Sequence, residues 1–272
     1  KKYTLTGQYV IDNAWTLNSA LQAAGAAGAA NVAAGGGLAG QMAALGAANG
    51  LLQKAELDNV SPQYVKSYDF GYRINGQKTA FDINVYYTEW DNFIAAKNVI
   101  TPMYMHPTFG GLAAIGQGDF RVMSIDSNTD TKVMTHGVSG SFETSLFKLY
   151  DFNLTSSFNK MEFDDPTSDY EAGFNTPQTR VKISLGSSKL ADNFAFNLSM
   201  RYHDGFLWQQ SGFPDGFVPE NTVFDASVNL AIPSIKGNIK IGGTNLGGDE
   251  YQPFIGTGSI GSQFYVGFTL NP

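Results

Sequence analysis

The chain has 272 residues, a formal net charge of −7 and no cysteine; 15% of its residues are charged and 13% are aromatic. The lack of cysteine excludes disulfides, thiolate metal sites and thiol catalysis. An acidic chain without a run of Lys or Arg does not favour a nucleic-acid partner, because nothing in it would neutralise phosphates. An apolar content of 43% is too low for a bundle of membrane helices, and the low charge together with 31 glycines indicates an all-β protein with many turns.

The segment from residue 13 to residue 53 carries no charge and is dominated by alanine and glycine, with three consecutive glycines at 35–37. One interpretation is a transmembrane helix, because several glycines stand at the GxxxG spacing that lets helices approach closely. The other is a pair of short Ala-rich helices, broken at the triple glycine, within an extracellular loop over 13–62. We favour the second interpretation, because alanine and glycine are weakly hydrophobic and the glycines interrupt the helix.

Beyond residue 63 the chain alternates between apolar and polar residues. Tyr68, Phe70 and Tyr72 fall on one face of an extended segment, because successive strand residues point to opposite faces. Asp69 and Arg73 fall on the other face. This alternation recurs in about ten segments and predicts strands with one apolar and one polar face. Downstream, the predicted apolar faces include Phe81, Ile83, Val85, Val138, Phe142, Phe152, Leu154, Phe158, Val181, Ile183, Phe196, Leu198, Phe224, Val228, Phe264, Val266 and Phe268.

The connections between these segments are short and long in turn. Tight turns are predicted at 75–76, 148–151, 191–193 and 234–237, and long connections at 13–62, 97–130, 164–177, 207–220 and 247–261. Short turns at one rim and long loops at the other are typical of outer-membrane barrels, where they are periplasmic and extracellular, respectively. The predicted fold class is therefore all-β: an antiparallel transmembrane β-barrel segment of about ten strands with an Ala/Gly-rich helical extracellular loop.

Several short motifs occur in a fixed order along residues 60–272. They include Val65–Arg73 (VKSYDFGYR), Phe174–Pro177 (FNTP), Val218–Leu230 (VPENTVFDASVNL) and Thr244–Tyr251 (TNLGGDEY). In this order and spacing the chain resembles the C-terminal part of TonB-dependent outer-membrane receptors, in particular the SusC-like and related barrels. The resemblance implies that residues 1–272 are the last strands of a barrel of about 22 strands, in the outer membrane of a Gram-negative bacterium. On this reading, the plug domain and the signal peptide are not present in the chain.

The function that the resemblance implies is TonB-dependent transport: a glycan, a peptide or a metal chelate binds at the outer loops and is imported into the periplasm. The implied partners are outer-membrane lipid, the remainder of the barrel with its plug domain, the TonB system acting through the plug, and a surface lipoprotein or other subunits of an outer-membrane complex. Two alternatives stay open. The uncharged segment would suit a structural or docking component of a larger complex, and a self-contained small barrel or porin is the other.

Candidate ligand contacts are aromatic residues and one histidine that the pattern places at the outer rim: Trp90, Tyr104, His106, Phe109 and Trp208. For the two tryptophans, the alternative is an aromatic belt at the membrane interface.

No catalytic constellation stands out. The three histidines lie on different predicted segments without ligand spacing, which argues against a metal site. In an acidic loop, Asp164, Asp165 and Asp169 are weak calcium candidates, but the lack of a calcium-loop spacing favours a solvated loop. We therefore expect neither enzyme activity nor a bound cofactor.

Overall fold

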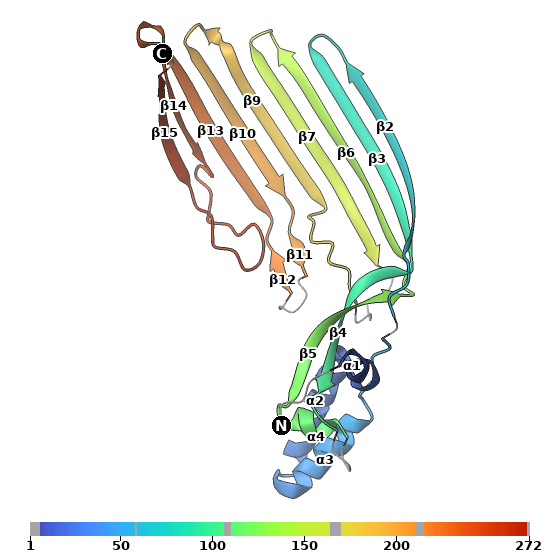
Figure 1. Ribbon diagram of the computed structural model, residues 1–272. Helices are drawn as coiled ribbons and strands as arrows, with labels where there is room; N and C mark the ends of the chain where they lie inside the picture. Colours follow the sequence, from blue (N-terminus) through green and yellow to red (C-terminus); the bar gives the residue numbers. More distant parts are fainter. Residues whose placement is uncertain (1–5, 58, 106–109, 164–169, 210–214, 271–272) are drawn as a thin grey trace.

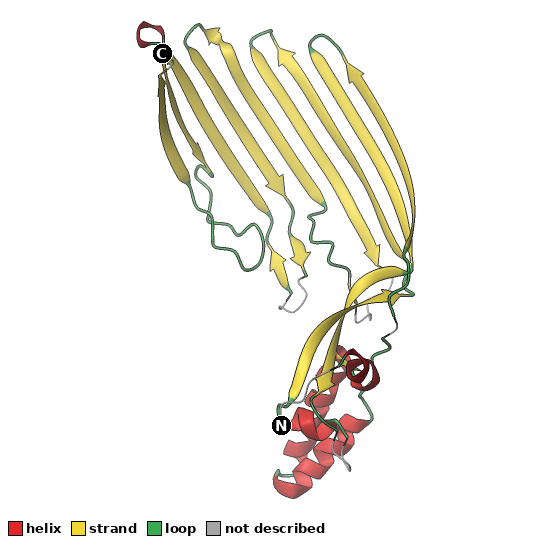
Figure 2. Cartoon of the chain, in the orientation of Figure 1, coloured by secondary structure: helices red, strands yellow, loops and turns green. Residues whose placement is uncertain are grey.

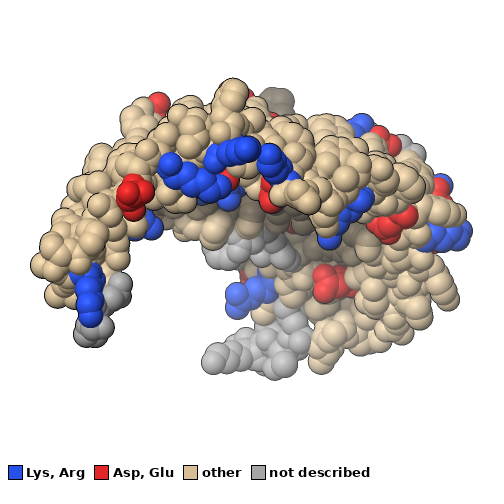
Figure 3. Space-filling model, turned by 90° about the horizontal axis from the view of Figure 1, so that it is seen from above, with Lys and Arg blue, Asp and Glu red and all other residues tan. Residues whose placement is uncertain are grey.

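The computed structural model describes residues 6–57, 59–105, 110–163, 170–209 and 215–270. Figures 1 and 2 show two parts: a broad curved sheet, here called the wall, and a smaller outer module that extends beyond one rim of the wall. The outer module comprises residues 7–57, 93–105 and 110–129. Seen from the opposite rim, the wall is an arch with charged residues scattered over it (Figure 3).

The wall is a single antiparallel sheet of nine strands. Their bounds are β2 (Tyr64–Asn75), β3 (Thr79–Asp91), β6 (Val133–Leu146), β7 (Tyr150–Phe163), β9 (Thr179–Ala191), β10 (Phe194–His203), β13 (Asn221–Ile232), β14 (Gly237–Thr244) and β15 (Gln263–Leu270). They lie in the order β15-β14-β13-β10-β9-β7-β6-β3-β2. Neighbours in the sheet are therefore also consecutive along the chain when the wall strands alone are counted. The predicted antiparallel barrel-type sheet is confirmed, with nine strands in the wall where about ten were expected.

The two faces of the wall differ in polarity. Across β2 and β3, Phe70 lies opposite Val85, while Arg73 lies opposite Asp82 on the other face, with Arg73 Nε 2.5 Å from Asp82 Oδ2. The face that carries Phe70 is called the apolar face, and the face that carries Arg73 the polar face. Phe70 is 67% exposed and Phe224 of β13 is 51% exposed, which suits contact with lipid better than contact with water.

The tight turns lie together at one rim of the wall (Figure 1). Between β2 and β3, the Gly76 N–H donates to the Thr79 carbonyl (2.8 Å). Between β6 and β7, Phe147 and Lys148 have positive φ angles of 53° and 59°. A short 3-10 helix, Pro233–Ile235, connects β13 with β14. The predicted tight turns are confirmed, and left-handed residues between β6 and β7 fit the twist of the paired strands.

Three helices build the first part of the outer module: α1 (Gly7–Asn13), α2 (Leu17–Ala33) and α3 (Gly37–Asn49). Thr16 caps α2 by accepting a hydrogen bond from the Ser19 N–H (3.3 Å). Gly35, Gly36 and Gly37 have φ angles of 74°, 74° and 65°, a region that glycine adopts without strain. The predicted pair of helices broken at the triple glycine is confirmed. None of the described helices is long and apolar enough to cross a membrane.

A second hairpin extends the β3–β6 pair beyond the long-loop rim. Its elements, and the two short strands that pair with it, are β4 (Phe93–Pro102), β5 (Phe120–Thr129), α4 (Leu112–Gly116), β1 (Trp15–Thr16) and β8 (Tyr170–Glu171). This finding corrects the prediction of a loop over 97–130. Because β4 is paired on both edges and covered by the helices, Val99 is 0% exposed and the strand lacks an alternating pattern.

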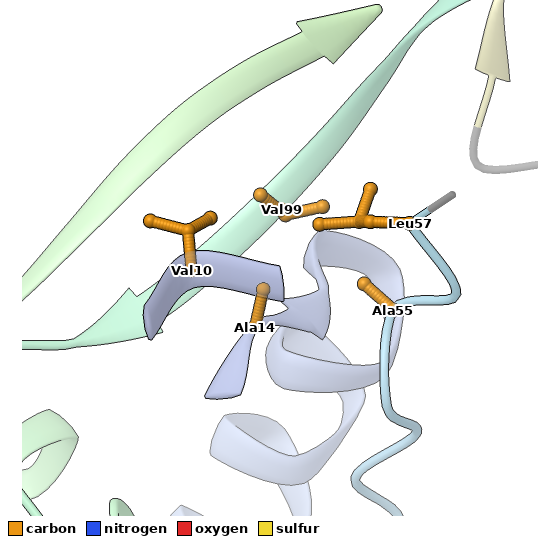
Figure 4. Packing of buried hydrophobic residues seen from close by; sticks show 5 residues of the cluster. All are labelled: Val10, Ala14, Ala55, Leu57 and Val99. Carbon is orange, nitrogen blue, oxygen red and sulfur yellow. The ribbon is translucent and has the colours of Figure 1, made fainter. Parts of the chain in front are cut away.

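The outer module has a small apolar core of its own. Figure 4 shows Val10 of α1, Ala14, Ala55, Leu57 and Val99 of β4 packed together, each at most 7% exposed. The chain that returns from α3 toward the wall is thereby fixed between α1 and β4.

Asparagine side chains fix the outer module to the wall where β3 passes into β4. Asn92, between these strands, has a φ of 58°. Asn128 Nδ2 donates to the carbonyls of Asn92 (2.9 Å) and Ser61 (3.0 Å), and the Ser61 N–H donates to Asn128 Oδ1 (2.7 Å). The Tyr170 hydroxyl donates to the Asn128 carbonyl (2.7 Å). Segments far apart in the sequence therefore meet in one polar joint.

Glu171 of β8 lies against β4 beside this joint. Asn98 Nδ2 donates a hydrogen bond to Glu171 Oε1. Burial raises the pKa of Glu171 above its ordinary value, the negative charge of Asp215 raises it further, and the Asn98 hydrogen bond lowers it. The charged carboxylate is thus disfavoured when β8 is docked, which links docking to pH.

Asn245 holds the loop between β14 and β15. It is 2% exposed and has a φ of 53°. Its N–H donates to Asp225 Oδ1 (3.1 Å), and its Nδ2 donates to the carbonyls of Asp249 (3.0 Å) and Ile260 (3.4 Å). Ser262 Oγ donates to the Asn245 carbonyl (2.5 Å). One residue therefore ties both ends of the 245–262 loop to the wall.

We expect Asn245→Ala to loosen this loop without preventing barrel assembly. The substitution removes two hydrogen bonds and places alanine at a positive φ, a combined cost of about 2–3 kcal/mol, or roughly a hundredfold rise in loop opening. Hydrogen exchange of residues 247–261 in the full-length protein measures this rise. Asn229→Ala, on the polar face of β13, is the matched control, and equal exchange in both variants would contradict the role of Asn245.

Lowering the pH is expected to tighten the docking of β8 on β4. A carboxyl whose folded pKa lies above its unfolded pKa binds more protons in the folded state, so docking weakens as the pH rises through the raised pKa. It strengthens as the pH falls toward the ordinary carboxyl range, about 4. Glu171→Gln should remove this dependence, and Asp215→Asn should reduce it. Hydrogen exchange of β4 and β8, corrected for intrinsic rates, checks both; an unchanged pH dependence in Glu171→Gln would refute the assignment.

Candidate functional site

A hollow of about 460 Å³ lies on the polar face of the wall at the long-loop rim. Its floor is formed by side chains of neighbouring wall strands, and residues of the loops complete its edge. The lining residues used below are Arg180 and Lys182 of β9, Arg201 and His203 of β10, and Phe206 and Tyr251 from the loop side. The hollow is where the polar face meets the long loops.

Two adjacent strands bring the basic side chains together. β9 and β10 are antiparallel, and their register places Lys182 opposite Arg201 and Arg180 opposite His203. Side chains directly opposite on one face of such a pair have Cβ atoms about 5 Å apart. Arg180, Lys182 and Arg201 are therefore close neighbours and are called the cationic cluster.

Within the described part of the chain, one of the three cations of the cluster forms an ion pair with a carboxylate. Arg201 Nη2 lies 3.0 Å from Asp225 Oδ2 of β13. The Asp225 carboxylate accepts two further hydrogen bonds from other groups. The side chains of Arg180 and Lys182 form no ion pair or hydrogen bond with another described residue. Their charges therefore depend on solvent or on a bound group.

A series of rings borders the hollow. The His203 ring lies 5.9 Å from Phe206, Phe206 lies 6.3 Å from Trp208, and Trp208 stacks on Phe254 at 5.1 Å. Phe206 and Trp208 belong to β11 (Phe206–Trp208), which pairs with β12 (Gly216–Val218). Trp208 Nε1 is buried and has no hydrogen-bond partner among the described residues. Phe206 lines the hollow, and the ring of Trp208, a predicted ligand contact, packs behind it.

The Phe174–Pro177 motif holds the β11–β12 hairpin against the wall. Asn175 has a φ of 45°; its Nδ2 donates to the Gln209 carbonyl (2.8 Å) and its Oδ1 accepts the Gln209 N–H (2.7 Å). The Thr179 N–H donates to Asp204 Oδ2 (3.0 Å). The Asn175 amide thus bonds both the N–H and the carbonyl of Gln209, as a neighbouring strand would, and so fixes the main chain just after β11.

Trp90 lies apart from this site. It is on the polar face of β3, opposite Val65 and Val133, and it meets the Phe93 ring edge-on at 5.7 Å. An aromatic belt in contact with lipid would lie on the apolar face, and Trp90 is on the other face. On the apolar face, ring pairs gather near the tight turns: Phe142 with Phe152, Tyr150 with Phe196, and Phe194 with Phe196.

Tyr104 lies in the connection that follows β4, and its hydroxyl donates to Gln117 Oε1 (3.0 Å). The site does not include it. Among the described residues, no group of three or more His, Asp or Glu side chains is placed to hold a metal ion. Outside the described residues lie the remaining candidates: His106, Phe109, Asp164, Asp165 and Asp169.

A larger hollow, of about 830 Å³, lies on the polar face at the tight-turn rim. Lys189 approaches Asp151 there (3.8 Å), and Glu143 accepts a hydrogen bond from Asn153 Nδ2 (2.8 Å). In barrels of this type, a ligand from outside meets the long loops first. We therefore place the candidate site at the long-loop rim.

Sequence reasoning did not single out the cationic cluster. Alternation assigns Arg180, Lys182 and Arg201 to polar faces one by one, but their meeting depends on the β9–β10 register. The available signal was that each of two consecutive strands carries two basic residues at a spacing of two, Arg180 with Lys182 and Arg201 with His203.

A family model described as "TonB dependent receptor-like, beta-barrel" matches residues 7–246. Among solved structures, the FrpB iron transporter from Neisseria meningitidis (F3-3 variant) has a TM-score of 0.53 at 12% identity, with 78% of this chain and 31% of that chain covered. The copper transporter OprC has a TM-score of 0.51 at 14% identity, covering 78% and 32%. The siderophore receptor PirA from Acinetobacter baumannii has a TM-score of 0.50 at 11% identity, covering 77% and 32%. No curated protein sequence matches this chain.

The chain spans about a third of the length of these three structures. At such low identity the likeness shows a shared fold. The match to the family model covers the outer module and every wall strand except β15. The apolar face of the wall is then the lipid-facing surface of an outer-membrane barrel, and the polar face lines its interior. The chain belongs to the TonB-dependent receptor-like β-barrel family, whose members lie in the outer membrane of Gram-negative bacteria.

Proposed function

We propose that this chain forms part of the wall and outer rim of a TonB-dependent importer. A nutrient binds at the long-loop rim and enters the periplasm when the TonB system, acting through a plug domain, opens the lumen. The observation that carries the proposal is the hollow on the interior face, which is lined by both the cationic cluster and the Phe206 ring at the rim that faces outward in such barrels.

The proposal includes a larger barrel, completed by strands outside this chain. Within the described residues, β2 and β15 each pair with one wall strand and not with each other. In lipid, an unpaired strand edge leaves N–H and C=O groups without partners, so that a spanning sheet has to close. This open sheet and the motif resemblance support residues 1–272 as the last part of a barrel of about 22 strands with a plug, rather than a self-contained small barrel.

The proposed nutrient is a glycan, a peptide or a metal chelate. The names of the similar structures, an iron transporter, a copper transporter and a siderophore receptor, support the metal chelate. Trp208, whose ring lies 6.3 Å from the Phe206 ring that lines the hollow, is a proposed contact. Tyr104, which follows β4 in the outer module, is a further proposed contact, as are His106 and Phe109, which lie outside the described residues, whereas Trp90 lies on the interior face of β3.

Docking of another subunit on the outer module is a second candidate function. The helices α2 and α3 carry no charge, and Leu21, Val32 and Met42 are 62%, 82% and 61% exposed. Large apolar side chains exposed on an uncharged surface are a feature of interaction sites on water-facing domains. A surface lipoprotein or another subunit of an outer-membrane complex would be the partner, with the wall as its scaffold.

Deletion of the full-length protein in its native host should impair growth on one class of nutrient, and inactivation of TonB should impair growth on the same class. Energised import needs both proteins, so that the double deletion should be no worse than either single one. Growth with glycans, peptides or iron chelates as the limiting source measures this. If TonB inactivation leaves growth unaffected while a partner subunit is lost from the outer membrane, the docking function holds instead.

Replacing Trp208 by alanine should lower uptake of the nutrient found in this way about tenfold, since an aromatic contact contributes roughly 1.5 kcal/mol. Phe224→Ala is the matched control, because Phe224 is an exposed ring on the apolar face. Heat-modifiable mobility in gel electrophoresis checks that both variants assemble. If both substitutions reduce uptake equally, Trp208 supports the fold rather than the ligand.

A further inference from the structure

Two like charges face each other directly on the interior of the wall. Lys182 and Arg201 are cross-strand partners, and Arg180 stands two residues before Lys182 on the same face of β9. Like charges directly opposite in a sheet destabilise it. Such an arrangement persists at a binding site because a negative group bound there relieves the repulsion.

The described residues neutralise only one of these three charges. Arg201 lies 3.0 Å from Asp225. Other interior carboxylates are engaged toward the tight turns: Asp151 lies 3.8 Å from Lys189, and Glu143 accepts a hydrogen bond from an asparagine amide. The other two cations of the cluster have no negative partner in the described part of the chain.

The hollow above the cationic cluster has the volume of a small-molecule site. Its volume is about 460 Å³, within the range of roughly 300–1,000 Å³ usual for such sites. Phe206 and Tyr251 stand at its edge, so that apolar surface adjoins the charged floor. Arginine binds oxyanions through two parallel N–H···O bonds, and lysine adds a compact positive charge. Because the hollow adjoins the long loops, it is reached from outside.

We propose that Arg180, Lys182 and Arg201 bind an oxyanion of the imported molecule, a carboxylate or a phosphate, in this hollow. The inference rests on the proposed function, because it assigns charge to the cargo of that importer. The anion site itself is a property of the purified protein and is measured without transport. The rings at the edge, Phe206 and Tyr251, contact the uncharged part of the same molecule.

The test measures binding of three probes to the full-length receptor in detergent by isothermal titration calorimetry: tricarballylate, its uncharged trimethyl ester and inorganic phosphate. We expect tricarballylate or phosphate to bind, the ester not to bind, and the affinity to fall as ionic strength rises. Lys182→Gln and Arg180→Gln should each weaken anion binding roughly tenfold, and Lys182→Arg should retain it. Lys240→Gln, an interior cation on β14 above the Tyr265 ring, is the matched control and should bind as the wild type does.

Binding of the ester as tight as that of tricarballylate, or an equal loss in Lys240→Gln and Lys182→Gln, would overturn the inference. So would a wild type that binds neither anion while Lys182→Gln lowers the melting temperature, because the cluster would then pair with an acidic residue of the receptor itself. Cluster-dependent anion binding without a TonB-linked growth defect would overturn the transport function alone. A TonB-linked defect without anion binding would overturn the inference alone.

Discussion

In lipid, every main-chain N–H and C=O group needs a partner within the protein, and the wall depends on this constraint. Long antiparallel pairs of strands such as β6 and β7 satisfy this requirement through the hydrogen bonds between them. The two sides of the sheet then differ only in their side chains. The side that carries Phe70 and Val85 takes the lipid, so that polar chemistry is confined to the interior and to the rims. Arg180 and Lys182, separated by one residue, therefore have to share the interior face.

The outer module follows a different rule, because it buries its apolar groups in a core of its own. β4 continues β3 past the bend at Asn92, yet Val99 of β4 is 0% exposed where Val85 of β3 is 44% exposed. The main chain thus passes from a lipid-facing to a covered environment within one extended hairpin. The polar joint around Asn128 lies at this change, because an amide side chain can bond the main-chain groups that are left where the wall ladder ends.

Sequence periodicity predicts what depends on the strand repeat and misses what depends on contacts between distant segments. The sequence predicts that Phe70 lies on the apolar face and that the helices are interrupted at the triple glycine, because both features are local. It assigns 97–130 to a loop, since β4 packs against α1 and β8 and so has no alternation. For the site, it does not predict the pairing of Lys182 with Arg201, because register is set by turns and partner strands together.

Asp225 connects the floor of the hollow to the loop at its edge. Its carboxylate lies 3.0 Å from Arg201 Nη2 and accepts the N–H of Asn245 (3.1 Å), the first residue of the 245–262 loop. An anion that draws Arg201 into the hollow competes with Asp225 for the same guanidinium, and a weakened Arg201 contact leaves the carboxylate more strongly committed to the loop. One carboxylate therefore contacts both the floor of the hollow and the loop at its edge, and the proposed anion would act on the loop through it.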